Sequence, residues 1–245
     1  GFYNYDTNLV TRFAAYTLMV YHTIIMPLQN RLNCVFFCGT AGALRRSVFE
    51  QVGGWNVQSI TEDSDLSVRI LSKRYKAVYL EHETLSEVPD TIEGFIKQQM
   101  RWVYGNTRVF IDHLKTLFVN RGLTVRQRLM ILYLTMGNLI APIVVIMTLF
   151  GILGWFVGDP TLLTAQDIIR FASRFALTAG FLTIGAITLY KNKRLSEFKY
   201  LVLSSFTVGI VLSFATTIAI GKAVLNSPLR WFCTPKSDNA KVVVE

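Results

Sequence analysis

The feature that most constrains the fold of this 245-residue chain is a pair of long stretches without a charged residue in its second half. Residues 130–157 contain no Asp, Glu, Lys or Arg over 28 positions, and residues 200–221 contain none over 22 positions. A helix needs about 20 apolar residues to cross the hydrocarbon of a bilayer, so both stretches are long enough. They predict membrane helices rather than the core of a soluble domain.

A third apolar segment, residues 171–190, is marginal in length, and we expect a membrane region over residues 121–221. Lys and Arg precede the first segment and recur in residues 191–199, which marks these flanks as cytoplasmic. The tail after the third segment is also basic. Three full crossings would place this tail on the outer side of the membrane, whereas basic flanks normally lie on the cytoplasmic side. We therefore expect residues 200–221 to lie along the interface or to re-enter. As an alternative, the stretch around Pro142 breaks into an interfacial helix followed by a short span, which changes the lengths of the segments but not the number of crossings.

The first 120 residues read as a mixed α/β unit with polar loops. Residues 33–38 and 76–80 are predicted strands, and residues 61–74 and 91–114 are predicted helices. A short helix that ends at a Gly–Gly pair is expected between the first strand and the first of these helices. The front half therefore differs in kind from the apolar second half.

The formal net charge of +9 raises the question of a nucleic-acid partner, but the chain has no recognised nucleic-acid-binding motif. Its Lys and Arg residues cluster beside the apolar segments, which a cytoplasmic membrane flank explains. The three cysteines, Cys34, Cys38 and Cys233, are odd in number and lack the spacing of a zinc site or a disulfide framework. These features favour a reduced, cytosolic catalytic part beside a bilayer, without a nucleic-acid partner.

Three carboxylates gather at the expected start of the helix at residues 61–74. Glu62, Asp63 and Asp65 stand there in the sequence SITEDSDL. Thr61 is a suitable N-cap, and acidic residues in a first turn offset the helix dipole by about 0.3–1 kcal/mol each. Taken alone, the cluster indicates a stable helix start.

Three other short patterns have both a structural and a functional interpretation. FFCGTAG, at residues 36–42, ends a predicted strand in a glycine turn that allows close approach of a ligand to the backbone. QQMRW places Gln98, Arg101 and Trp102 on one helical face, either as buried amphipathic surface or as a grip for phosphate and a stacking platform for a sugar. RWFCTPK, at residues 230–236, is either a membrane-interface anchor or a binding loop.

In their order and spacing, these patterns resemble the membrane-embedded family 2 glycosyltransferases, which include cellulose, mannan, glucan, chitin and hyaluronan synthases. The resemblance runs from about residue 7 onward. It implies a GT-A (Rossmann-like) α/β fold followed by transmembrane and interfacial helices. Residues 1–120 would be the C-terminal half of a cytosolic GT-A domain, and residues 222–245 would be a gating-loop-like segment.

The resemblance also implies site residues, position by position. Asp63, the last residue of Thr-Glu-Asp, would be the catalytic general base that takes the proton from the acceptor hydroxyl. The residues implied in binding the acceptor sugar are Cys38, Gly39, Thr40, Glu62 and Trp102. Those implied in binding the donor and its pyrophosphate are Gln98, Arg101, Trp231, Thr234 and Lys236, with Cys233 in place of the family's valine.

The expected partners are a nucleotide sugar (UDP- or GDP-hexose), a polysaccharide acceptor and the lipid bilayer. The expected cofactor of the full-length enzyme is a divalent metal, Mg²⁺ or Mn²⁺. The family's Asp-x-Asp motif for this metal does not occur earlier in the chain, and Asp63-Ser64-Asp65 belongs to the Thr-Glu-Asp region. We therefore expect the C-terminal portion of a longer enzyme, without the metal ligands and inactive by itself.

The leading hypothesis is an inverting, processive glycosyltransferase that extends a β-linked polysaccharide and passes it across the cell (inner or plasma) membrane. The protein would cross this membrane several times and keep its catalytic part cytoplasmic. One alternative is a non-processive membrane glycosyltransferase that makes a glycolipid, which would differ in product size. The other is a non-catalytic transporter or scaffold subunit. The apolar segments contain no central ionisable residue of the kind that marks an ion path, which argues against a transporter.

Overall fold

The structure, a computed structural model, describes residues 1–82, 84–157 and 180–229. Over these ranges it consists of helices joined by loops and has no β-strand, although an isolated bridge pairs Phe2 with Ser86. The helical elements, in chain order, are α1 (Leu9–Val20), a π-helical turn (Tyr21–Ile25), α2 (Met26–Arg31), α3 (Arg46–Gln51), α4 (Glu62–Ser72), α5 (Ile92–Asp112), α6 (Leu114–Val119), α7 (Val125–Met136), a 3-10 turn (Gly137–Leu139), α8 (Ile140–Val157), α10 (Gly180–Lys191), a second 3-10 turn (Leu195–Glu197) and α11 (Phe198–Val224).

The predicted strands at residues 33–38 and 76–80 are irregular segments outside any sheet, and the first of them starts in a turn at Asn33, so this prediction was wrong. A strand forms when its backbone N–H and C=O groups pair with those of another strand. Here side chains pair with the backbone instead. Phe36 N–H donates to Gln29 Oε1 (2.9 Å), and Phe37 N–H donates to Ser67 Oγ of α4 (2.8 Å). The α/β sheet of the expected GT-A fold is not confirmed within the described residues.

The helices predicted in the front half are confirmed, and local signals explain their ends. α5 begins after Thr91, whose hydroxyl accepts from the Gly94 backbone N–H (3.2 Å). α3 is followed by Gly53 and Gly54, which adopt φ of 89° and 68°. This left-handed conformation strains a residue with a Cβ, so the glycine pair ends the helix there.

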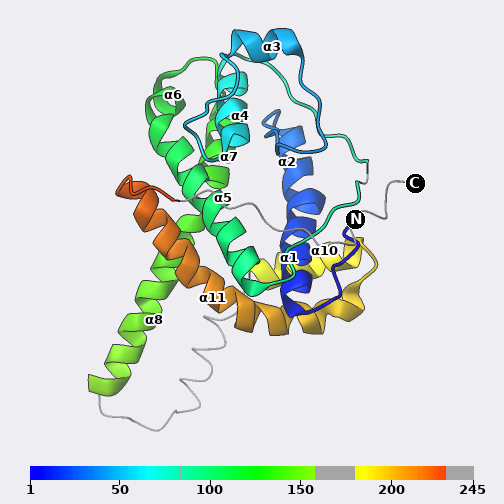
Figure 1. Cartoon of the computed structure of the whole chain (residues 1–245), viewed down its shortest axis with the longest axis vertical. Coiled ribbons are helices and arrows are strands. Elements are labelled where there is room, and N and C mark those ends of the chain that lie inside the picture. The colour runs from blue at the N-terminus through cyan, green and yellow to red at the C-terminus, as the bar shows by residue number, and fades with distance from the viewer. Residues whose placement is uncertain (83, 158–179, 230–245) are drawn as a thin grey trace.

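The core lies on two sides of α5, which runs through the middle of the molecule (Figure 1). On one side, Val109 belongs to a buried cluster with Val68 of α4 and Ile131 of α7. On the other side, α5 packs against α1 and α11, and Phe95 meets Phe13 edge to face with ring centroids 5.9 Å apart. These two contacts fix the position of the helix that carries the QQMRW sequence.

Within the residues that the structure describes, three helical stretches are long and apolar enough to cross a membrane: Leu9–Arg31, Val125–Gly154 and Leu195–Val224. The last two overlap the apolar segments predicted at residues 130–157 and 200–221. Leu9–Arg31 was not anticipated from the sequence. In the marginal segment between them, α10 is a helix of 12 residues, and the part before it lies outside the described residues.

The apolar segment predicted at residues 130–157 is divided in the structure. α7 packs against α5, and the turn at Gly137–Leu139 separates it from α8, whose third residue is Pro142. The helix is thus interrupted close to this proline, whereas an interfacial helix followed by a short span stays a prediction. Figure 1 shows α8 projecting away from the other helices, and Met147 and Phe150 are each 69% exposed. α8 presents the apolar surface expected of a helix in lipid.

α11 runs beside α5 rather than standing apart. Ala219 and Ile220 of α11 form a buried cluster with Val103 and Tyr104 of α5. Near the end of this contact, the guanidinium of Arg108 reaches a backbone carbonyl of α11 (3.4 Å). The segment expected at the membrane interface thus packs on the helix that contains the predicted donor-binding residues.

Candidate active site

The start of α4 is fixed by a close approach of α5 rather than by a side-chain cap. Thr61 occupies the N-cap position, as predicted, but its side chain makes no capping hydrogen bond. Its hydroxyl is buried and faces Gly105 of α5, where a Cβ would overlap the threonine side chain. The missing side chain at Gly105 lets the α5 backbone close down on the first turn of α4.

Asp63 lies against the turn formed by Cys38, Gly39 and Thr40. Gly39 has φ +71°, and a Cβ added to it would lie 3.1 Å from Asp63 Oδ2. The other carboxylate oxygen, Oδ1, accepts from the Ser64 backbone N–H (2.7 Å). Gly39 and Thr40 are exposed, so the carboxylate lies beside a surface that solutes reach. The structure therefore brings Asp63 to the turn that the sequence predicts for acceptor binding.

The surroundings of Asp63 suit a proton acceptor. Burial raises the pKa of this carboxyl above its ordinary value, and the charge of Glu62, which is exposed beside it, adds to this effect. The Ser64 N–H and the charge of Arg101 act in the opposite direction on the pKa. A carboxylate with a raised pKa has a greater affinity for a proton, which is what general-base catalysis requires.

The face of α5 nearest to Asp63 carries Gln98, Arg101 and Trp102. These residues stand seven, four and three positions before Gly105, so all four share one face of the helix. Gly105 packs on the N-cap residue of α4, and the charge of Arg101 acts on the Asp63 carboxylate. The three predicted side chains are half-buried. The structure thus places this face at the start of α4.

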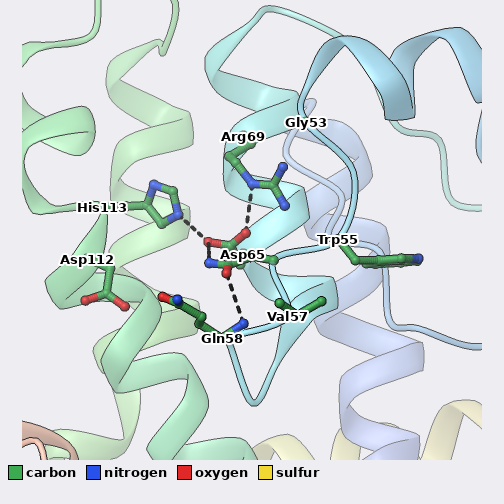
Figure 2. Close-up of a pocket in the computed structure, with 9 residues that line it drawn as sticks. Gly53, Trp55, Val57, Gln58, Asp65, Arg69, Asp112 and His113 are labelled. Atoms are coloured by element: carbon green, nitrogen blue, oxygen red, sulfur yellow. Dashed lines mark hydrogen bonds and ion pairs between the residues drawn. The ribbon is translucent and has the colours of Figure 1, made fainter.

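Asp65 has different surroundings, although it is only two residues further along α4. It is 3% exposed, Arg69 Nε donates to its Oδ2 (2.7 Å), and His113 Nε2 lies 2.7 Å from its Oδ1. Figure 2 shows both side chains pointing at Asp65 in the wall of a pocket of about 520 Å³. Arg69 also donates to the Gly54 carbonyl (2.8 Å), so the network joins α4 to the end of α5 and to the turn after α3. The lining of this pocket includes Asp65 but not Asp63.

The partners of Asp65 reverse the effect of burial on its acidity. Burial alone would raise the pKa of this carboxyl, but the hydrogen bond with His113 and the charge and hydrogen bond of Arg69 outweigh it. The pKa of Asp65 is therefore held below its ordinary value. A carboxylate that fixed partners keep ionised is a poor proton acceptor, so the surroundings of Asp65 suit a base less well than those of Asp63.

The predicted donor-binding residues are only partly placed by the structure. Gln98 and Arg101 lie on α5 as described, whereas Trp231, Thr234 and Lys236 lie outside the described residues. Over residues 1–82, 84–157 and 180–229, no group of three His, Cys, Asp or Glu side chains is placed to hold a metal ion. The divalent cation that the resemblance implies thus has no ligand set among these residues.

Two residues of this site were not identified from the sequence. Gly105 had a signal, because a glycine inside a helix costs about 1 kcal/mol relative to alanine and this one stands on the Arg101 face. Ser67 had none, since a serine in an amphipathic helix is ordinary. Its Oγ accepts from the Phe37 N–H (2.8 Å) and donates to the Asp63 carbonyl (2.7 Å), which ties the segment before the turn to α4.

Known proteins resemble this chain over about half of its length. It is 33% identical over 134 residues to glucomannan 4-beta-mannosyltransferase 1 of Oryza sativa subsp. japonica and 31% identical over 134 residues to glucomannan 4-beta-mannosyltransferase 9 of Arabidopsis thaliana. Both matches cover 54% of this chain and 26% and 25% of the relatives. It is also 26% identical over 111 residues to the UDP-forming cellulose synthase catalytic subunit of Xanthomonas axonopodis pv. citri, with 45% of this chain and 15% of the relative covered. The chain spans at most about a quarter of the length of these relatives.

The match to a protein family is wider than these pairwise matches. The family described as Glycosyl transferase family group 2 matches residues 1–220. This range contains the Gly39 turn, the Asp63 helix start, the Arg101 face of α5 and most of α11. The chain therefore belongs to glycosyl transferase family group 2.

Proposed function

We propose that this chain contains the acceptor-activating part of an inverting glycosyltransferase, which transfers a hexose from a nucleotide sugar to a growing β-linked polysaccharide. The observation that supports this most directly is the position of Asp63, which lies against the exposed Gly39 turn with a raised pKa. The substrate class is supported by the names of the relatives, which are glucomannan mannosyltransferases and a UDP-forming cellulose synthase subunit. UDP- and GDP-hexoses are both candidate donors.

In the proposed reaction, the acceptor hydroxyl oxygen attacks the anomeric carbon of the donor sugar. Asp63 takes the proton of that hydroxyl, and the bond from the anomeric carbon to the diphosphate oxygen breaks with its electron pair on the leaving group. A positioned general base of this kind contributes about 10²–10⁴-fold. Negative charge grows on the departing nucleoside diphosphate, and Arg101 supplies positive charge close to Asp63, where it stabilises that charge.

We further propose that the enzyme is processive and membrane-embedded at the cell membrane, with residues 1–120 on the cytoplasmic side. Trp102 would stack on the terminal acceptor sugar while Gln98 and Arg101 face the donor. The loop residues Trp231, Thr234 and Lys236 would close over the bound nucleotide sugar, together with a divalent metal held elsewhere in the enzyme. The apolar surface of α8 supports insertion in the bilayer.

The packing of α11 supports an interfacial position for residues 200–221. α5 carries Lys97, Arg101, Arg108 and Asp112, and charged side chains are costly in hydrocarbon. Since α11 lies along α5, both helices fit best at the depth of the lipid headgroups. The charged side chains of α5 would otherwise follow α11 into the membrane.

The test of this function is Asp63→Asn in the full-length protein, assayed in membranes of an expressing host with radiolabelled GDP-mannose and UDP-glucose. We expect incorporation into polymer to fall by at least about 10²-fold. Asp112→Asn is the control, because Asp112 is a half-exposed carboxylate paired with Arg108 (2.7 Å) at the far end of α5. Incorporation by Asp63→Asn within twofold of the unsubstituted protein would refute the proposal.

Product size separates a processive enzyme from one that makes a glycolipid. We expect label in material of high molecular weight that resists lipid extraction. A product that is extracted by organic solvent and carries one labelled sugar would instead identify a non-processive enzyme. Transport without incorporation, unchanged in Asp63→Asn, would identify a transporter.

A further inference from the structure

The helical stretch Leu9–Arg31 is apolar enough to cross a membrane, yet some of its polar side chains turn towards the candidate active site. It consists of α1, a π-helical turn at Tyr21–Ile25 and α2. A π-helical turn inserts an extra residue into a helix and redirects the side chains around it, and such turns are frequent at functional sites. Here the inserted turn begins at Tyr21.

Gln29 of α2 uses both ends of its amide to hold the segment that leads to the turn. It is fully buried. Its Oε1 accepts from the Phe36 backbone N–H (2.9 Å), and its Nε2 donates to the Tyr21 hydroxyl (3.3 Å). Its backbone carbonyl accepts from the Cys34 N–H (2.9 Å). A buried amide with these bonds is a fixed point, because the loss of any one of them leaves a buried polar group unpaired.

Tyr21 connects this fixed point to the turn itself. Its hydroxyl lies 3.7 Å from Cys38 Sγ, a hydrogen-bond distance for sulfur. The charge of Asp63 also acts on this hydroxyl. Cys38 is followed by Gly39, whose missing side chain lets the turn approach the Asp63 carboxylate. A chain of contacts thus runs from α2 through Tyr21 to the proposed general base.

α4 supplies the second support of the same segment. Ser67 Oγ accepts from the Phe37 N–H and donates to the backbone carbonyl of Asp63. Residues 36–38 are therefore held by side chains from α2, the π-helical turn and α4. These side chains provide what a neighbouring strand would provide in a sheet.

We propose that Tyr21 and Gln29 are positioning residues that hold the Cys38–Gly39–Thr40 turn against Asp63, and that Leu9–Arg31 belongs to the catalytic part and does not cross the bilayer. The inference rests on the proposed function, because the turn matters only if Asp63 activates an acceptor. The inference adds Tyr21 and Gln29 to the site, two residues that belong to none of the motifs found in the sequence.

The packing of Leu9–Arg31 joins it to α5 of the catalytic part and to α11, the helix proposed to lie at the interface. The most apolar window of this stretch is 39% buried inside the protein, against 22% for Val125–Gly154. Phe13 packs against Phe95 of α5 and, in the same cluster, against Val208 of α11. The apolar character of Leu9–Arg31 is thus explained by contacts with protein, whereas that of α8 is not.

The kinetic test is Tyr21→Phe in the full-length protein, in membranes of an expressing host. The donors are radiolabelled GDP-mannose and UDP-glucose, and the acceptors are β-1,4-mannohexaose and cellohexaose. We expect the KM for the acceptor to rise roughly three- to tenfold, because the turn loses one hydrogen-bonded support. The KM for the donor should not change. The thermal midpoint should fall by a few degrees, because Gln29 Nε2 loses its acceptor, and by no more than in Tyr16→Phe, which also loses a hydroxyl hydrogen bond. Gln29→Met, which removes both amide bonds at similar length, should raise the acceptor KM further.

Tyr16→Phe is the matched control. Tyr16 stands on the same helix, and its hydroxyl donates to Glu197 (2.9 Å), remote from the turn. This variant loses the same atom and should leave the acceptor KM unchanged. Equal acceptor KM values in Tyr21→Phe and Tyr16→Phe, in a preparation where Asp63→Asn is inactive, would overturn the positioning role alone. An active Asp63→Asn would instead overturn the proposed function.

Labelling tests the placement of Leu9–Arg31 without reference to activity. Asp6→Cys and Arg31→Cys introduce exposed thiols just outside and at the end of this stretch. They are made in a background in which the natural cysteines are replaced by serine and are treated with a membrane-impermeant maleimide in sealed vesicles of both orientations. We expect both positions to react from the same side. Reaction from opposite sides would show that the stretch crosses the bilayer.

Discussion

Asp63 and Asp65 stand two residues apart in the first turn of α4, yet the two sides of this turn have opposite chemistry. On the Asp63 side, the carboxylate meets an exposed glycine turn, and burial raises its pKa. On the Asp65 side, Arg69 and His113 hold the carboxylate ionised, and its pKa is lowered. We call these the base side and the clamp side of α4.

The difference shows that an acidic cluster at a helix start does not have a single role. The dipole of α4 acts on both carboxylates alike, so it cannot distinguish them. The distinction comes from residues distant in sequence: His113 is 48 positions from Asp65, and Gly39 is 24 positions from Asp63. Each side can be disrupted while the other is left intact, which makes the comparison testable.

The largest expected effect on stability is that of Asp65→Ala on the clamp side. It leaves Arg69 and His113 without their buried partner, and removal of one member of a buried ion pair costs about 3–5 kcal/mol. Thermal unfolding in detergent measures this loss. Asp112→Ala is the control, because an exposed pair contributes only about 0–1 kcal/mol. A variant that unfolds like the unsubstituted protein but fails to transfer sugar would place Asp65 on the base side.

Two glycines allow the two sides to be compared by one chemical change. Gly39→Ala and Gly53→Ala both place a Cβ in the left-handed region, at φ +71° and +89°, and should each cost about 1–2 kcal/mol of stability. Only at Gly39 does the new Cβ crowd the Asp63 carboxylate, at 3.1 Å; at Gly53 the nearest atom is 3.9 Å away. We expect Gly39→Ala to lose roughly tenfold or more in kcat/KM and Gly53→Ala to keep its rate per folded molecule. Similar rates in the two variants would contradict the close contact of the turn with Asp63.

The helices were predictable from the sequence because their signals are local. The spacing of apolar residues and the cap at Thr91 define α5, and the pair Gly53 and Gly54 ends α3. The strands were not predictable, because a short apolar run is buried equally well in a sheet or in an extended segment. At residues 33–38, the backbone N–H groups of Phe36 and Phe37 bond to the side chains of Gln29 and Ser67 rather than to a second strand.

The sequence predicted which residues belong to the candidate site, but it did not predict that Asp63 and Asp65 have different surroundings. The order of the motifs indicated Asp63, the Gly39 turn and the Arg101 face together, and the structure brings these three into one place. Thr61 is the predicted N-cap residue but lacks the capping hydrogen bond, and its side chain instead packs against α5, which comes this close because residue 105 is a glycine. The surroundings of Thr61 and of the two aspartates therefore depend on side-chain contacts between segments distant in sequence, which local patterns do not reveal.

Ionisation of the two carboxyl groups should change the stability of the folded protein at neutral pH in opposite directions. The folded-state pKa of Asp63 is raised, so its contribution is favourable at low pH and is lost as pH rises through that pKa. The folded-state pKa of Asp65 is lowered, so its contribution is present above the unfolded value of about 3.9 and is lost as pH falls through the folded pKa. At pH 7 we therefore expect Asp63→Asn to raise the thermal midpoint and Asp65→Asn to lower it. Shifts of the same sign would contradict the division of the turn.

The smallest expected effect is that of Glu62→Gln, which tests how the base side is tuned. The exposed Glu62 carboxylate raises the pKa of Asp63 through its negative charge, so its neutralisation should lower that pKa. The acidic limb of the profile of kcat/KM against pH should move to lower pH, while the plateau rate stays within about twofold because no proton acceptor is lost. High salt should weaken the shift, since the interaction passes partly through solvent. A fall in the plateau with an unmoved acidic limb would instead show that Glu62 acts through acceptor binding, the role that the resemblance implies, and not through the pKa of Asp63.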